Sequence, residues 1–437
     1  MRQWIVFISF FVLIVPLQAE AEEIIKKGET LTLERCIEIA LQMQPSIIAA
    51  QGAVDVNASR VGQARSNYFP QVNWSSSYSR ISPASGGLSR LSGTQGASFS
   101  SSGDAFDEYS TGLNLSQMIY DFGKTPTQVR IRNLTLDSSR SDLRNTSDQI
   151  ILSVKKAYYG VVQAKYNVMV AEDTVKQTQQ HLEQAKGFYE VGTKPKFDVT
   201  KAEVDVSNAK LNLIRNENAF KVSVVTLNNV MGVPDAPEYT LNETMTFEKY
   251  DITLEEAMKK AYENRPDLKS IVTQRKAAES AVGLAKTGYY PVLTGSAGYS
   301  WSGEQFPLEH GWNAGATLSF PLFNGFLTKH QVEEARANLN ILKANEELLR
   351  QIIFLEVQQA YLTLRAAEEA IPTAKLGVEQ AQENLEIANG RYAAGVGNPI
   401  EVTDAEVGLA NARTYYIQAL YADKIAQASL VKAMGLK

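Results

Sequence analysis

An internal duplication constrains the fold of this chain more than any other feature of its sequence. Pro45 is matched by Pro266, and the offset between their numbers (266 − 45 = 221) holds through the surrounding segment. Further along, Tyr189 is matched by Tyr392 at a smaller offset (392 − 189 = 203), again without a gap. The difference between the offsets (221 − 203 = 18) is the length of an insertion in the first copy. Chance identity does not explain a register kept over two long blocks, so we expect two copies of one structural unit.

Each copy has the same predicted order of elements: a helix, a pair of strands, and a long helical hairpin. We expect the first repeat over residues 22–232, with its strand pair at about 71–120. The second repeat is expected over residues 252–437, with its strand pair at about 292–322. A linker, residues 233–251, separates them and has no counterpart after the second copy.

The N-terminus has the pattern of a secretory signal peptide. Arg2 precedes an apolar run, Trp4–Val15, that is shorter than a comfortable membrane span. Small residues follow, so we expect residues 1–21 to be removed by cleavage after Ala21 or after Ala19. An N-terminal anchor helix is the alternative interpretation.

The rest of the composition excludes several classes of function. No segment is basic enough to indicate nucleic-acid binding, and the net charge is −5. The one cysteine, Cys36, argues against a disulfide framework or a cysteine-rich metal site. The three histidines (His181, His310 and His330) are scattered and have no catalytic spacing, so we expect neither an enzyme nor a cofactor or metal site.

The strand pairs alternate apolar and small polar residues with a period of two, as half-buried strands do. An apolar face suits lipid and a polar face suits a water-filled lumen. Five aromatic residues fall where a girdle at the membrane boundary would place them: Trp74, Tyr78, Tyr299, Trp301 and Trp312. A small soluble sheet with aromatic core residues is the alternative. Four strands cannot close a transmembrane barrel, so we expect the chain to pool its strands with copies of itself.

The long helix of each copy has a coiled-coil pattern. Apolar residues recur in alternating steps of four and three, from Ile150 to Tyr189 and from Ile353 to Tyr392. A helix of about 66 residues reaches roughly 100 Å, which suits crossing a compartment better than building a globular core. Each seam ends in a turn that contains glycine and proline, so the chain is expected to return as a helical hairpin.

The two turns carry a related motif. The first reads Phe188–Gly192 followed by Asp198–Val199, and the second reads Arg391–Gly395 followed by Glu401–Val402. Together with the duplication and the paired strands, this ordered set resembles the TolC-like outer-membrane factor family over about residues 30–436.

The resemblance implies a mixed α/β membrane protein in the bacterial outer membrane. It would be a homotrimer, with a 12-stranded transmembrane β-barrel, four strands from each chain, surrounded by outer-membrane lipid. A long α-helical coiled-coil tunnel would continue the barrel into the periplasm. The implied function is the exit duct of a tripartite efflux or type I secretion system, with a periplasmic adaptor and an inner-membrane pump as partners. A trimeric surface stalk or adhesin without transport is the alternative.

The resemblance also implies roles for residues at the turns. Family members contact the adaptor with their tips, and the corresponding and flanking residues here are Gly192, Thr193, Gly395 and Val396, with Tyr189 and Tyr392 beside them. The alternative is that both glycines only satisfy turn geometry.

The family narrows its periplasmic mouth with acidic residues just past the second tip. These positions hold Glu401 and Asp404 here, with Asp198 in the first copy. Three-fold repetition would concentrate negative charge and attract cations; the alternative is that the acids only complement a helix dipole. Some relatives use an arginine two residues after the second tip glycine in a constricting ion-pair network. Gly397 stands there, so we expect a different or weaker closure.

Overall fold

The computed structural model describes residues 25–82, 105–242 and 246–436. The expected signal peptide, residues 1–21, lies outside them. The chain divides into two compact units, and each unit draws on both repeats. The first unit comprises the described residues of Met1–Gln44, Ser153–Thr246 and Gly377–Tyr421, and the second comprises those of Pro45–Leu152, Phe247–Leu376 and Ala422–Lys437.

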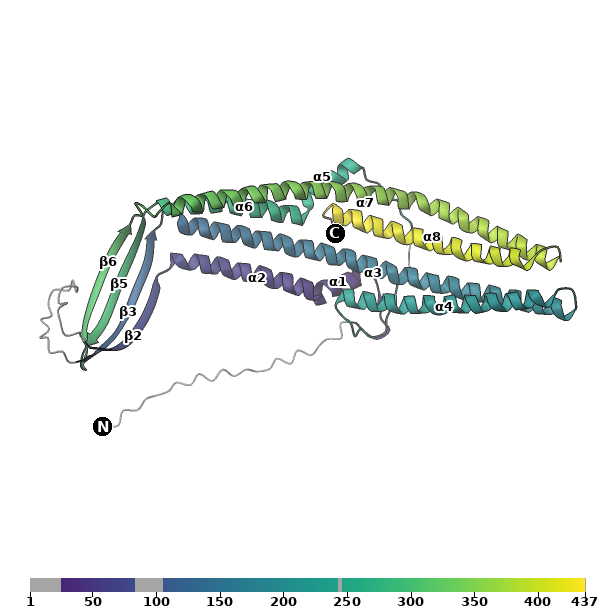
Figure 1. Ribbon diagram of the computed structural model, residues 1–437, viewed down its shortest axis with the longest axis horizontal. Helices are drawn as coiled ribbons and strands as arrows, with labels where there is room; N and C mark the ends of the chain where they lie inside the picture. Colours follow the sequence, from purple (N-terminus) through teal and green to yellow (C-terminus); the bar gives the residue numbers. More distant parts are fainter. Residues whose placement is uncertain (1–24, 83–104, 243–245, 437) are drawn as a thin grey trace, which may run out of the picture. The chain divides into compact units, whose positions relative to one another are not determined.

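The long helices α3, α4, α7 and α8 are drawn in Figure 1, and their bounds keep the register of the duplication. Helices α3 (Lys124–Glu190) and α7 (Leu327–Ala393) are both 67 residues long, and they begin at equivalent positions of the two copies. Their partners, α4 (Lys196–Met231) and α8 (Pro399–Ala433), begin at the same offset from each other as α3 and α7 do (399 − 196 = 327 − 124). No helix in the described part of the chain is both long and apolar enough to cross a membrane.

The shorter helices are duplicated in the same way, with the larger offset of the N-terminal block (254 − 33 = 266 − 45). They are α1 (Leu33–Met43), α2 (Pro45–Arg65), the 3-10 turn η1 (Ser66–Tyr68), α5 (Leu254–Asn264), α6 (Pro266–Lys286) and η2 (Thr287–Tyr289). Equivalent threonines cap α1 and α5. Thr32 accepts a hydrogen bond from the Arg35 amide, and Thr253 forms a reciprocal capping box with Glu256.

Four strands form one antiparallel sheet in the order β2–β3–β5–β6 (Figure 1). Their bounds are β2 (Gln71–Ile81), β3 (Phe106–Tyr120), β5 (Val292–Gly303) and β6 (Glu309–Ser319). Separately, β1 (Thr30–Leu31) and β4 (Thr240–Leu241) form a short parallel pair. The four-stranded sheet joins the two predicted strand pairs through β3 and β5.

The register of this sheet sorts its residues by face. One row of neighbours across all four strands is Trp74, Leu113, Tyr299 and Trp312. The next row, on the opposite face because successive residues of a strand alternate, is Asn73, Asn114, Gly298 and Asn313. The alternation predicted from the sequence is therefore kept across all four strands in these rows, whereas the register of β3 with β5 shifts between Met118 and Tyr120.

Each unit has its own hydrophobic core. In the second unit, residues of α5, α6, α7 and α8 pack around fully buried side chains such as Ile353, Leu364 and Leu430. In the first unit, a cluster near the end of α7 and the start of α8 contains Leu385, Tyr392, Val402 and Leu409. The cluster in the first unit positions the residues of the hairpin tips.

Candidate functional site at the hairpin tips

The two turns have the same backbone. Gly192 and Gly395 both have a φ of 77°, a left-handed conformation that side chains disfavour. A Cβ atom at either glycine would meet nothing within 4 Å, so the backbone conformation alone calls for glycine. The next residue closes each turn: the Thr193 amide donates to Phe188 O at 2.9 Å, and the Val396 amide donates to Arg391 O at 3.1 Å. All four predicted tip residues are exposed.

Gly397 has no room for a side chain. A Cβ atom there would lie 2.7 Å from Tyr392 N and 2.8 Å from the carbonyl carbon of Arg391. Its own carbonyl oxygen accepts a hydrogen bond of 3.3 Å from Lys194 Nζ of the other turn. The same ammonium group lies 5.1 Å from the centre of the Tyr392 ring, within the range of a cation–π contact. A lysine of the first tip therefore supplies positive charge beside the second tip.

The two tip-flanking tyrosines differ in environment although they are equivalent in sequence. Tyr189 is 46 % exposed, whereas Tyr392 is completely buried. The Tyr392 hydroxyl donates to Asp198 Oδ2 at 3.3 Å, and its ring lies 5.0 Å from the ring of His181 and 5.7 Å from that of Phe188. Burial, together with the negative charge and hydrogen bond of Asp198, raises the pKa of Tyr392 to about 12. Tyr392 thus joins α7 to both helices of the first hairpin.

The three predicted acids also separate by burial. Asp198 is only 4 % exposed and contacts Tyr392. Glu401 is exposed and forms an ion pair of 3.2 Å with Arg391, and Asp404 is exposed. Of the three, the acids that present negative charge to solvent at this end are therefore Glu401 and Asp404, and Arg391 offsets part of that charge.

A layer of polar side chains lies behind the tip, between the two hairpins of the first unit. Lys201 Nζ contacts Asp205 Oδ1 at 2.6 Å, and Thr403 Oγ1 donates to Asp205 Oδ2 at 2.9 Å, so α4 and α8 are bonded together. Glu406 and His181 are buried in the same region. No group of three or more His, Cys, Asp or Glu side chains in the described residues is arranged to hold a metal ion.

The prediction from sequence missed this layer because it followed apolar residues only. After Ala171 the seam of α3 continues through Thr178 and His181 to Ala185, all of them buried. These positions keep the alternating steps of three and four if Thr174 is included. Polar residues at seam spacing were the available signal.

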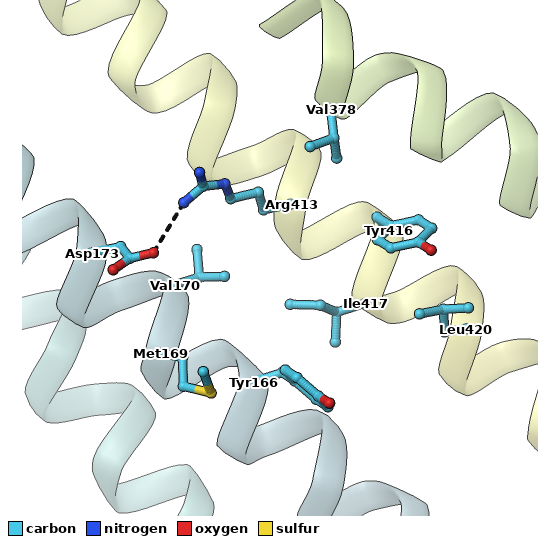
Figure 2. A pocket seen from close by; sticks show the side chains of 9 residues that line it. All are labelled: Tyr166, Met169, Val170, Asp173, Val378, Arg413, Tyr416, Ile417 and Leu420. Carbon is cyan, nitrogen blue, oxygen red and sulfur yellow. Dashed lines mark hydrogen bonds and ion pairs between the residues drawn. The ribbon is translucent and has the colours of Figure 1, made fainter. Parts of the chain in front are cut away.

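A cavity of about 450 Å³ lies elsewhere on the same hairpins, between α3 and α8 (Figure 2). Figure 2 shows apolar side chains of both helices around it, with Val378 of α7 at its edge. Arg413 closes one side, where it donates to Asp173 Oδ2 at 3.1 Å and to Gln382 Oε1 at 3.3 Å. The cavity combines an apolar lining with one ion pair.

The predicted girdle residues lie in the sheet of the other unit. Trp74 and Trp312 are exposed members of one row across the strands, and Trp74 Nε1 donates to Thr111 Oγ1 at 3.0 Å. Tyr299 and Trp301 are edge-to-face neighbours at 4.7 Å, and Tyr78 lies 5.2 Å from Tyr109. The sheet thus presents large aromatic side chains that no described residue covers completely.

Most of the chain matches a known protein family, in both of its repeats. The family model for "Outer membrane efflux protein" matches residues 36–233 and 257–436. The toluene efflux pump outer membrane protein TtgC of Pseudomonas putida is 23 % identical over 416 residues, covering 92 % of this chain and 82 % of TtgC. The outer membrane protein TolC of Vibrio cholerae is 23 % identical over 405 residues, covering 86 % of each chain.

A solved structure shares the fold. The CmeC outer membrane channel of Campylobacter jejuni superposes with a TM-score of 0.80 at 18 % identity, covering 92 % of this chain and 85 % of CmeC. The long helices, the four-stranded antiparallel sheet and the duplicated halves are those of the TolC-like fold, as the sequence predicted. The chain therefore belongs to the outer membrane efflux protein family, and it is an outer-membrane channel of efflux or secretion systems, extending into the periplasm, and not an enzyme.

Proposed function

We propose that three copies of this chain assemble into an exit duct that receives substrates from an inner-membrane pump through a periplasmic adaptor. The observation that carries the assembly is an apolar seam on α7 that the described residues of the chain leave exposed. Exposed residues recur there at multiples of seven positions: Ile341, Leu348, Leu355, Leu362 and Leu376. An apolar residue at every seventh position keeps to one side of a coiled-coil helix, so this stripe is suited to packing against another helix. In this proposal a second copy of the chain covers it.

The sheet supports the same assembly. Strands β2 and β6 are its outermost strands, so each has one edge without a partner among the described strands of this chain. An unpaired strand edge is not tolerated in lipid, and in water it tends to pair with another chain. Pairing β6 of one copy with β2 of the next would give twelve strands in a trimer, with Trp74 and Trp312 in the aromatic girdle.

The tips are proposed to contact the adaptor. Val396 is highly exposed and lies beside the left-handed Gly395, and Gly192 with Thr193 forms the equivalent surface on the first hairpin. An exposed apolar residue on a rigid turn is suited to a pocket in a partner. Identifying the adaptor would identify the pump class, and through it the cargo.

The mouth is proposed to select by charge. Glu401 and Asp404 are exposed near the second tip, and three copies would place six carboxylates (2 × 3) around one opening. Such a ring attracts cations and disfavours anions. Asp198 is buried in each chain and would support the ring from behind through Tyr392.

The first test is single-channel conductance of the purified protein in planar bilayers, wild type against the Glu401→Gln, Asp404→Asn double variant. We expect discrete channels, cation selectivity in the wild type, and reduced selectivity and weaker block by multivalent cations in the variant. Channels with unchanged selectivity in the variant would exclude the acidic ring as the cause of selectivity but would still support the exit duct. Absence of any channel, with intact trimers, would favour the structural stalk.

The second test is capture of the purified trimer by candidate periplasmic adaptors. Val396→Asp places a charge on the tip without changing its glycine, and Glu379→Gln, an exposed residue of α7 away from the tip, serves as the matched control. Capture by one adaptor that is lost with Val396→Asp and kept with Glu379→Gln would support the proposal. Equal capture of all three proteins would exclude the second tip as the contact.

A further inference from the structure

Glu406 is the most unusual ionisable residue near the tip. Its side chain is 4 % exposed, and Oε2 has no hydrogen-bond partner among the described residues. It lies on α8 next to the contact with α4, shortly after Glu401 and Asp404 in the chain. A carboxylate in such a place loses its hydration without gaining a partner, so its neutral form is favoured.

The charged and titratable groups of this polar layer come from three helices, and those that act directly on Glu406 are Asp205 and Lys201. Helix α4 contributes Asp205 and Lys201, which are bonded to each other, and Asp198 lies nearer the tip. Helix α3 contributes His181, whose Nδ1 atom also lacks a partner in the described chain, and burial lowers its pKa. Helix α7 contributes Tyr392, which remains neutral well above neutral pH.

These neighbours do not neutralise Glu406. The single positive charge of Lys201 is already committed to Asp205, so an ionised Glu406 adds an unpaired negative charge to the layer. Burial first, and then the charge of Asp205, raise the pKa of Glu406 to about 7, while Lys201 opposes this shift. The carboxyl group therefore changes charge close to neutral pH.

We infer that the Glu406 carboxyl group is a proton-binding site that links the packing of the α3–α4 hairpin against the α7–α8 hairpin to pH. With the proton bound, the neutral carboxyl group lies in the layer at little cost. Without it, repulsion from Asp205 and the lost hydration loosen α8 from α4. This packing lies within one chain, so its dependence on pH does not require that the tips bind an adaptor.

The direction of the effect follows from the raised pKa. The packed state holds the proton more tightly than the loosened state, in which the carboxyl group is hydrated. Packing is therefore strongest in acid and weakens as pH rises through the range between the ordinary glutamate pKa and about 7. The opening equilibrium changes by at most about tenfold per pH unit in that range.

The test is hydrogen–deuterium exchange of the intact protein, followed in peptides from α4 and α8 between about pH 5 and about pH 9 and corrected for the chemical exchange rate. The Glu406→Gln variant keeps the shape of the protonated residue and should remain protected at every pH. Glu203→Gln is the matched control, because Glu203 is the equivalent residue of the first copy (406 − 203 = 203) and is exposed. It should keep the wild-type transition.

Two further variants test the direction in which nearby charges move the pH of the transition. Asp205→Asn removes the repulsive charge and should move the transition to lower pH, whereas Lys201→Met removes the attractive charge and should move it to higher pH. Opposite displacements in these directions support the inference. A wild-type protein without a transition, or a Glu406→Gln variant that retains it, overturns the inference. A transition lost only in His181→Gln overturns it in favour of the histidine.

Discussion

The two hairpin tips share a backbone but divide the chemistry between them. Tyr189 and Tyr392 are equivalent residues, as are Asp198 and Glu401, since both pairs have the same offset (392 − 189 = 401 − 198). In the first copy the tyrosine is exposed and the carboxylate is buried; in the second copy the tyrosine is buried and the carboxylate is exposed. The buried tyrosine of the second copy and the buried carboxylate of the first copy meet in the hydrogen bond from the Tyr392 hydroxyl to Asp198.

This difference shows what a duplication permits. Two identical hairpins packed side by side would need one surface to be both interface and solvent face. Because the copies diverged, each keeps one polar group inward and presents the other outward. A third equivalent pair is in direct contact: Lys194 Nζ of the first tip donates to the carbonyl oxygen of Gly397, its counterpart in the second (397 − 194 = 203).

The largest difference in stability between the two tips is expected when each tyrosine is replaced by alanine. Tyr392→Ala removes a completely buried ring and should lower the free energy of unfolding by about 3–5 kcal/mol. Tyr189→Ala changes an exposed side chain and should cost less than about 1 kcal/mol. Loss of helical circular dichroism in denaturant measures both. Equal costs would mean that the two tips are packed alike.

The carboxylates should rank the same way with smaller effects. Asp198→Ala leaves the buried Tyr392 hydroxyl without its acceptor and should cost about 1–3 kcal/mol. Glu401→Ala removes an exposed ion pair with Arg391 and should cost about 0–1 kcal/mol. Denaturant midpoints of the two variants, measured in the same detergent, give the comparison. Tyr392→Phe is the control, since it should recover part of the stability lost with Asp198→Ala when the two are combined.

Alanine should lower the stability equally at the two turn glycines, because the backbone of the two copies is equivalent there. Gly192→Ala and Gly395→Ala each force an alanine into a left-handed conformation, at about 1–2 kcal/mol. Neither meets a steric obstacle, so the two costs should agree closely. Gly397→Ala differs, because its Cβ would collide with backbone atoms of Arg391 and Tyr392. If Gly397→Ala lowered the stability no more than the other two substitutions, the backbone around Gly397 would not be as closely packed as described.

The smallest effect is expected at the cavity between α3 and α8. Asp173→Ala breaks its ion pair with Arg413, but Asp173 is exposed and the pair is screened, so stability should change by less than about 1 kcal/mol. Arg413→Ala should cost more, since the arginine also donates to Gln382 and its side chain lines the cavity. Thermal melting of both variants is sufficient. A large effect of Asp173→Ala would show that this region is shielded from solvent.

The fold followed from the sequence because its two main signals reinforce each other. The constant offset of the second block required α3 and α7 to begin and end at equivalent positions, and they do. The alternation in the strand pairs predicted which residues share a face, although not that β3 lies beside β5 and so joins the pairs into one sheet.

The site was harder to predict, for a physical reason. Equivalent positions in the two copies have similar residue types, so the sequence does not reveal that Tyr392 is buried while Tyr189 is exposed. Burial there is decided by which faces of two hairpins meet. The polar seam at Thr178 and His181 was missed because the coiled-coil pattern is defined by apolar residues. Gly397 was recognised as unusual, but the contribution of Lys194 was not visible from spacing.

The equal length of α3 and α7 restricts how such a molecule can change in evolution. One residue inserted into either helix would advance its tip by about 1.5 Å and turn the following seam by about 100°. An insertion of a whole heptad into α3 or α7 would turn the apolar seam back toward its partner. It would still separate Lys194 from Gly397 unless the equivalent helix of the other repeat lengthened as well. Hairpins of this kind are therefore expected to grow or shrink in whole heptads and in both repeats at once, so their lengths among descendants should form a discrete series.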